Sequence, residues 1–318
     1  MPNSIEEVRL TADDAIISKM SCVELGYYKD DYIHNFIHRR AKRSPLINRG
    51  YYSRVAAIDL VVNRFISHYD GNCQIISLGG GYDTLFFRLH AMQSRPALFV
   101  DLDLPETCRT KAMIIRNKPE LARVVFGNSH VDPSDSTPFI ETKEYILHPM
   151  NLTDTQAMKL FLSSGKMDLS LPTLFLSECV LIYIAPEKVN PTLQLLQQSF
   201  PNSCIVVYEQ IRPSDPFGQM MIRNLHERGC DLLSMEAYPE LEDQKKRYRE
   251  LGFTSVFCRD MYDVYSKMLD GNDVKRISRI EWFDEFEEWH LIQAHYCLLV
   301  AAQGSFDSWF SELTKNAS

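Results

Sequence analysis

The chain has 318 residues, of which 45% are hydrophobic and 24% charged, as in an ordinary globular protein with a large core. Its formal net charge of −8 argues against a nucleic-acid partner, because such proteins usually carry a basic excess. The most apolar window, 171–186, is too short to span a bilayer, and the chain opens without a basic and apolar leader. We therefore expect a cytoplasmic protein that does not enter a membrane.

Residues 1–70 are predicted to form a helical N-terminal cap ahead of the first strand. Amphipathic spacing indicates helices over 15–25 and 32–42, and a third over about 50–69. Basic side chains gather in this segment, among them Lys19, Arg39, Arg40, Lys42, Arg43, Arg49 and Arg54. They form either an ordinary solvated helix face or an electropositive mouth for an anionic substrate.

The central motif is a buried strand that runs into three consecutive glycines and then into a helix, over residues 75–89. A dinucleotide-binding loop has a third, spaced glycine where this chain has Thr84, and the lysine of a phosphate-binding loop is also missing. The motif is either a plain tight turn or a site for a nucleoside ligand without pyrophosphate. S-adenosylmethionine is the obvious candidate.

The second predicted strand, 97–103, supports the ligand interpretation because it ends in an acid. A carboxylate at this place, that of Asp103, can accept charge-assisted hydrogen bonds from two ribose hydroxyls. Strand, glycine loop, helix, strand and terminal acid together are more specific than the glycines alone.

Residues 73–210 alternate between apolar strands and amphipathic helices, which predicts a mainly parallel sheet covered by helices on both faces. After the glycine loop, strands are expected at 97–103, 122–127, 143–148, 173–178 and 203–209, with helices at 105–118, 153–164 and 187–199. The eight cysteines contain no C-x-x-C pair, so we expect buried free thiols and no metal site.

Residues 211–250 interrupt this alternation and are predicted to form a helical lid insertion. A strand at 253–258, a helical stretch at 259–289 and a last strand at 290–302 follow. A late strand pair of this kind indicates an antiparallel edge added to a parallel sheet.

Several segments together resemble the leucine carboxyl methyltransferases, which methylate the C-terminal leucine carboxylate of the protein phosphatase 2A catalytic subunit. The resemblance extends from about residue 19 to 301. It is carried by residues 19–27, 45–55, 79–84, 100–103, 177–183, 208–210, 217–219 and 295–297. It implies a class I, Rossmann-like methyltransferase fold with a mostly parallel seven-stranded sheet and an antiparallel edge strand, over 71–318, behind the cap of 1–70.

The resemblance also implies where S-adenosyl-L-methionine would bind. Gly79 and Gly81 would bracket its methionine portion, and Asp103 would hold its ribose. Asn151 and Leu152 stand where the family usually has Asp-Leu beside the adenine, so an acceptor is kept but a charge is lost.

Four further positions match the family's cofactor site. Glu178 ends an apolar strand, where an acid is costly unless it has a partner, and this favours a ligand role over a structural one. Lys19 and Arg54 match positions near the cofactor's carboxylate, and Tyr183 is a weaker candidate for lining the site. One departure is Pro216, which replaces an arginine of the family; Arg212 is the candidate to compensate.

The implied chemistry needs few catalytic groups. A substrate carboxylate is already ionised at neutral pH and can attack the methyl group without a general base. No catalytic residue is therefore assigned, although Arg54 and Tyr183 are candidates for positioning, and the cap cations are expected to guide the anionic tail. The resemblance implies the phosphatase 2A catalytic subunit as partner, through its C-terminal tail and its folded domain. The methyl ester would regulate holoenzyme assembly, and S-adenosyl-L-homocysteine would be released.

Three other functions remain open. The first is carboxyl methylation of a different substrate. The second is the related tRNA wybutosine enzyme, which usually carries a C-terminal β-propeller; the end of this chain at Ser318 and its acidic charge argue against it. The third is a non-catalytic holder of the phosphatase, which the intact glycine loop and its acids argue against.

Overall fold

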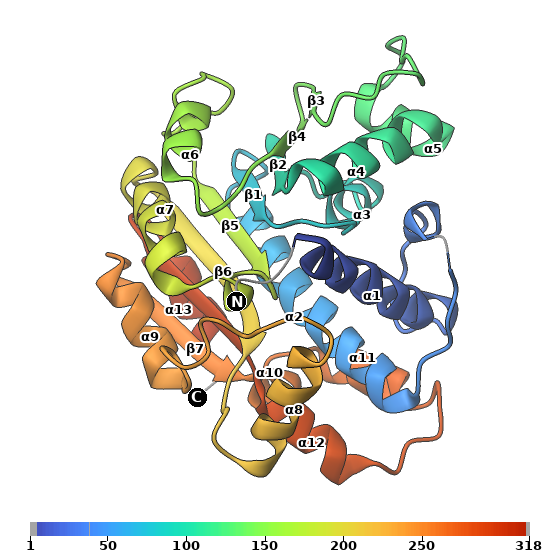
Figure 1. The fold of residues 1–318 in the computed structure, drawn as a ribbon, viewed down its shortest axis with the longest axis vertical. Coiled ribbons are helices and arrows are strands. Elements are labelled where there is room, and N and C mark those ends of the chain that lie inside the picture. Colours follow the sequence, from blue (N-terminus) through green and yellow to red (C-terminus); the bar gives the residue numbers. More distant parts are fainter. Residues whose placement is uncertain (1–4, 38, 316–318) are drawn as a thin grey trace.

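An eight-stranded sheet forms the centre of the protein, in the strand order β3-β4-β2-β1-β5-β6-β8-β7 (Figure 1). The computed structural model describes residues 5–37 and 39–315. Residues 1–4 of the predicted cap (1–70), residue 38, and residues 316–318 of the predicted domain (71–318) lie outside the described part. The strands are β1 (Gln74–Leu78), β2 (Leu98–Asp103), β3 (Ile140–Glu141), β4 (Tyr145–Pro149), β5 (Thr173–Glu178), β6 (Ser203–Gln210), β7 (Ser255–Asp260) and β8 (Tyr296–Gln303).

The predicted mostly parallel sheet is confirmed. Strands β4, β2, β1, β5 and β6 are parallel, and β8 pairs antiparallel with both β6 and β7. The antiparallel strand β8 is thus second from the edge of the sheet, because β7 pairs with its outer side. The two-residue β3, antiparallel to β4, is the eighth strand and is too short to leave a periodic signal in the sequence.

Helices cover both faces of the sheet (Figure 1). They are α1 (Ile5–Glu24), η1 (Ile33–Phe36), α2 (Pro45–His68), α3 (Leu85–Ala91), α4 (Pro105–Asn117), α5 (Pro119–Phe126), α6 (Thr155–Leu162), η2 (Leu181–Tyr183), α7 (Pro186–Ser199), α8 (Pro216–His226), α9 (Leu241–Glu250), α10 (Met261–Lys267), α11 (Gly271–Ile277), α12 (Phe286–Ala294) and α13 (Asp307–Lys315). Within the described ranges, no helix has the length and apolar content that a bilayer crossing requires.

Strand alternation explains why helices are needed on both faces. Neighbours such as Ile75 and Ile76 point to opposite sides, and each belongs to a different large apolar cluster. Helices α1 and α2 contribute to one of these clusters. All eight cysteines are free and seven are buried, as expected. The division of the chain near residue 70 stays a prediction.

Four segments differ from their prediction. The expected strand 122–127 belongs to α5, because Pro119 starts a helix whose apolar side, Leu121 and Val125, is buried. Of the described residues in the expected helix over 32–42, only those of η1 are helical. The stretch 259–289 contains three separate helices, and the expected last strand begins only at Tyr296, since 290–294 complete α12.

A buried ion pair connects three of these elements. Lys111 of α4 lies 2.9 Å from Asp101 of β2, and the hydroxyl of Tyr145 in β4 donates to the same carboxylate at 2.7 Å. Lys111 also donates to the carbonyl of Asp83, 3.0 Å away, in the segment after the glycines. The Lys111 side chain is only 1% exposed, so its charge depends on these partners.

We expect Lys111→Met to lower the free energy of unfolding by about 3–5 kcal/mol, because the substitution leaves a buried carboxylate without its cation. Urea unfolding monitored by circular dichroism measures the change. Lys29→Met is the control, since Lys29 pairs with Asp31 at the surface and such pairs contribute at most about 1 kcal/mol. Equal losses in the two variants would contradict the structural role of the buried pair.

Candidate functional site

A cavity of about 990 Å³ opens at the carboxyl ends of the parallel strands. Its wall includes the segments that follow β1, β2, β4 and β5, together with parts of α1, α2 and the 211–250 insertion. The volume lies at the upper end of the range for small-molecule sites. The structure brings all nine predicted cofactor residues to this wall: Lys19, Arg54, Gly79, Gly81, Asp103, Asn151, Leu152, Glu178 and Tyr183.

The glycine loop has a geometry that other residues would not adopt. Gly79 and Gly81 have φ angles of +75° and +50°, in the left-handed region. A Cβ atom on Gly79 would lie 2.6 Å from a methyl group of Val180, and one on Gly80 would lie 2.5 Å from a carboxylate oxygen of Asp101. The loop is therefore a tight turn, and it is also a stretch of bare backbone facing the cavity, as a bound ligand requires.

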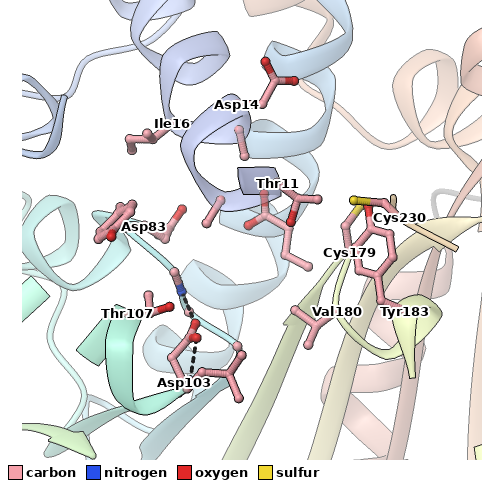
Figure 2. Close-up of a pocket in the computed structure, with 18 of the residues that line it drawn as sticks. Thr11, Asp14, Ile16, Asp83, Asp103, Thr107, Cys179, Val180, Tyr183 and Cys230 are labelled. Atoms are coloured by element: carbon pink, nitrogen blue, oxygen red, sulfur yellow. Dashed lines mark hydrogen bonds between the residues drawn. The ribbon is translucent and has the colours of Figure 1, made fainter. Parts of the chain in front are cut away.

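Asp103 is held in place by the loop that it faces. One of its carboxylate oxygens accepts a hydrogen bond from the N–H of Gly81 and the other from the N–H of Leu104, each at 2.7 Å (Figure 2). Burial raises the pKa of Asp103, against the opposing effect of these two N–H groups. A fixed carboxylate at the end of β2 is suited to hydroxyl donors such as those of a ribose.

A buried ion cluster occupies the centre of the cavity wall. Glu178, at the end of β5, accepts a hydrogen bond from Nε of Arg54 in α2, and its Oε1 lies 2.8 Å from the ammonium of Lys19 in α1. The same ammonium contacts the carboxylate of Asp83. Glu178 thus has two cationic partners within the protein, so the cost of an unpaired acid does not by itself require a ligand, and its ligand role stays a prediction. Two cations and two acids balance each other.

Lys19, Arg54 and Asp83 have pKa values shifted toward their charged forms. Burial disfavours the charged form of Lys19, but Asp83 and Glu178 raise its pKa overall. The pKa of Arg54 is likewise raised by Glu178 in spite of burial. Burial alone would raise the pKa of Asp83, but the nearby cations of Lys19 and Arg88 hold this pKa well below its ordinary value.

The far side of the cavity is largely apolar and aromatic. Figure 2 shows Cys179, Val180, Tyr183 and Cys230 together there, opposite Asp103 and Thr107. Tyr51 and Tyr296 also line the cavity. Burial raises the pKa values of Tyr51, Tyr183 and Tyr296, so these phenols remain neutral at physiological pH. The cavity therefore has a polar end suited to a nucleoside and an apolar end suited to an aliphatic side chain.

Two of the predicted contacts look different in the structure. The carboxamide oxygen of Asn151 already accepts hydrogen bonds from the N–H and the hydroxyl of Thr153, at 3.0 and 2.9 Å, so the acceptor expected to face the adenine is engaged. Arg212 binds the carbonyl of Ala294 and the carboxylate of Asp260, and it does not line the cavity. It does not take the place of the arginine that Pro216 replaces.

Sequence reasoning missed two kinds of site residue. Asp83 lies two residues after the last glycine, so its position in the motif could have indicated a role in the site. Tyr296, Leu225, Arg228 and Cys230 come from the last strand and the insertion, and only the fold brings them to the cavity. No group of three or more His, Cys, Asp or Glu side chains within the described residues is placed to hold a metal ion.

Comparisons with known proteins agree with this geometry. A model of the family described as leucine carboxyl methyltransferase matches residues 9–197. The Arabidopsis thaliana leucine carboxyl methyltransferase 1 homolog is 41% identical over 92% of this chain and 88% of its own length. Leucine carboxyl methyltransferase 1 of Rattus norvegicus is 33% identical over 97% and 93%.

Two further matches are more distant in length or in sequence. The human tRNA wybutosine-synthesizing protein 4 is 36% identical over 93% of this chain, but the match covers only 44% of that protein. A solved structure of a DUF574 family protein from Streptomyces avermitilis has a TM-score of 0.54 at 12% identity, covering 92% of this chain and 97% of that one. The structural likeness supports the fold alone.

We expect Gly79→Ala to abolish measurable binding of S-adenosylmethionine, because the new methyl group collides with Val180 and displaces the loop. The control is Gly165→Ala: Gly165 has nearly the same φ angle, +74° against +75°, but a Cβ there meets no atom within 4 Å. Both variants carry the backbone strain, of about 1 kcal/mol, and only one disturbs the cavity. Isothermal titration calorimetry measures the binding, and equal affinities in the two variants would refute a cofactor role for the loop.

A second prediction concerns pH. Glu209 of β6 is fully buried, and burial raises its pKa from 4.5 to about 7, opposed by Arg247 and by the N–H groups of Ile182 and Leu181. Between these two values the folded protein holds a proton that the unfolded chain releases. The contribution of Glu209 to the free energy of unfolding therefore falls by about 3 kcal/mol as pH rises from about 4.5 to 7.

Glu209→Gln should remove that dependence. We expect the variant to gain stability relative to the wild type as pH rises: the difference in free energy of unfolding, variant minus wild type, should be larger at pH 8 than at pH 5. Urea unfolding at both pH values measures this difference. The exposed Glu227→Gln serves as the control and should show no such difference. An equal effect of Glu209→Gln at both pH values would show that this carboxyl does not titrate in the window.

Proposed function

Because the chain belongs to the leucine carboxyl methyltransferase family and is thus an S-adenosylmethionine-dependent methyltransferase, we propose that it methylates the C-terminal leucine carboxylate of the protein phosphatase 2A catalytic subunit. The observation that carries the proposal is the near full-length match to relatives of that name. The resulting methyl ester would regulate assembly of the phosphatase holoenzyme, and we place the reaction in the cytoplasm.

The residues on the cavity wall fit the cofactor. Bare backbone at Gly79 and Gly81 permits close approach, and the fixed carboxylate of Asp103 is suited to the ribose hydroxyls. Leu152 lies on the wall after β4, where it can contact the adenine, whereas the side-chain oxygen of the neighbouring Asn151 is engaged by Thr153. S-adenosyl-L-methionine supplies an electrophilic sulfonium methyl group and leaves as S-adenosyl-L-homocysteine.

The central ion cluster can hold the amino-acid end of the cofactor. Lys19, Arg54 and Glu178 present opposite charges side by side, matching an ammonium and a carboxylate on one ligand. All three are buried or nearly so, which strengthens their interactions with a bound charge. The cluster would thereby fix the direction in which the methyl group points.

The chain then needs to orient the substrate rather than to activate it. A C-terminal carboxylate is ionised at neutral pH, so no proton has to be removed from it. The aromatic rings of Tyr51, Tyr183 and Tyr296 would exclude water from the apolar end of the cavity, and a desolvated carboxylate is the better nucleophile. Holding the carboxylate in line with the methyl group accounts for the remainder of the rate enhancement.

A second candidate substrate follows from the likeness to the human tRNA wybutosine-synthesizing protein 4. Its match to this chain is as close in identity as those of several carboxyl methyltransferases, although it covers less than half of that protein. The apolar end of the cavity favours a leucine tail over a nucleoside. The net charge of −8 also disfavours tRNA, which is a polyanion.

We expect the purified protein to transfer a radiolabelled methyl group from S-adenosylmethionine to purified phosphatase 2A catalytic subunit. The label should be base-labile, as an ester is, and absent from a subunit that lacks its final leucine. Unfractionated tRNA in a parallel reaction tests the second candidate. Cofactor binding without label on the intact subunit would refute the proposal and would leave another carboxylate substrate or a holding role.

A further inference from the structure

We propose that Lys188 and Arg228, at the rim of the cavity, recognise the anionic C-terminus of the substrate before it reaches the methyl group. This inference rests on the proposed function and names a part of the site that the nine predicted residues do not include. It starts from the five cations that line the cavity, which are Lys19, Arg43, Arg54, Lys188 and Arg228.

Three of these cations are already neutralised. Lys19 and Arg54 share the carboxylate of Glu178, and Arg43 contacts the carboxylate of Asp14. The expectation that cap cations such as Arg54 attract the substrate is therefore weakened, because a paired charge has little field at a distance. These residues can still hold groups that come into direct contact with them.

The other two cations have no such partner. Neither Lys188 nor Arg228 forms an ion pair with any residue in the described part of the chain, and both side chains are exposed. The acids next to them in sequence, Glu187 and Glu227, do not line the cavity. The two positive charges are thus available to a ligand at the cavity.

Their exposure places them at the solvent end of the cavity. Lys188 lies in the first turn of α7 and Arg228 just after α8, in the insertion. The insertion is fixed to the wall below it, because the N–H of Ser234 donates to the carbonyl of Ile182 at 3.1 Å. Beside the two cations, the wall from these segments is mainly apolar and includes Tyr183, Ile184, Leu225, Cys230 and Leu233.

This arrangement separates recognition from reaction. Free cations at the rim attract a carboxylate over several ångströms, roughly within the Debye length of about 8–10 Å. Deeper in the cavity every cation is shared with an acid, so the carboxylate is not neutralised where it has to act as a nucleophile. An apolar wall between the two regions suits the side chain of a terminal leucine. The ligand class is therefore a peptide with a free C-terminal carboxylate and an apolar last residue.

The test is charge reversal in the full-length protein, with the double variant Lys188→Glu/Arg228→Glu. The control is Lys159→Glu/Arg223→Glu, in which exposed cations of α6 and α8 that do not line the cavity are reversed to the same extent. The substrate is a peptide of the phosphatase C-terminus ending in leucine, at saturating S-adenosylmethionine. We measure kcat and KM at low salt and at about 0.5 M salt, where screening removes most of the attraction.

We expect the rim variant to lose kcat/KM by about tenfold or more at low salt, through KM, with kcat and cofactor affinity unchanged. The loss should shrink at high salt, and the control should stay within about twofold of the wild type. Equal behaviour of the two double variants, or a loss in kcat alone, would overturn the inference while leaving the proposed function intact. If the wild type methylates neither the peptide nor the folded subunit, the proposed function fails and the inference fails with it.

Discussion

The carboxylate of Glu178 is the constraint on which the site depends. It ends β5, and it draws the cations of Lys19 and Arg54 from two helices that precede the sheet in the chain. Buried ion pairs are costly to desolvate and contribute little net stability, whereas an unpaired buried charge is strongly destabilising. The pairing therefore constrains position: α1 and α2 have to pack so that both cations reach this one carboxylate.

That constraint gives the cavity its chemical character. Because Glu178 and Asp83 balance Lys19 and Arg54, the centre of the wall is polar but nearly neutral. A nucleophile with a full negative charge can stay unpaired beside such a wall and remain reactive. The positive charges that would attract it are kept at the rim instead. In the proposed reaction, attraction and reactivity, which make opposite demands on a carboxylate, would be met in different places.

A second set of buried contacts supports the loop from behind. Lys111, Asp101 and Tyr145 join α4, β2 and β4, and Lys111 also holds the carbonyl of Asp83. Asp83 is thus fixed through its backbone by one cation and through its side chain by Lys19. The glycine loop can consist of bare backbone without becoming loose, since its neighbours on both sides are anchored.

The sequence by itself determined the alternation that gives a mostly parallel sheet, the glycine turn, the acid at the end of β2 and the cost of an unpaired acid at Glu178. These are local patterns, and local sterics and burial decide them. Only the tertiary structure decided which cations are paired, because Lys19 and Glu178 are 159 positions apart and their meeting depends on how α1 packs. It also decided that 122–126 is helical, where Pro119 outweighs a β-branched pair. The same holds for Lys188 and Arg228 at the rim. The sequence shows that they are charged, but only the fold decides whether an acid lies close enough to pair with them.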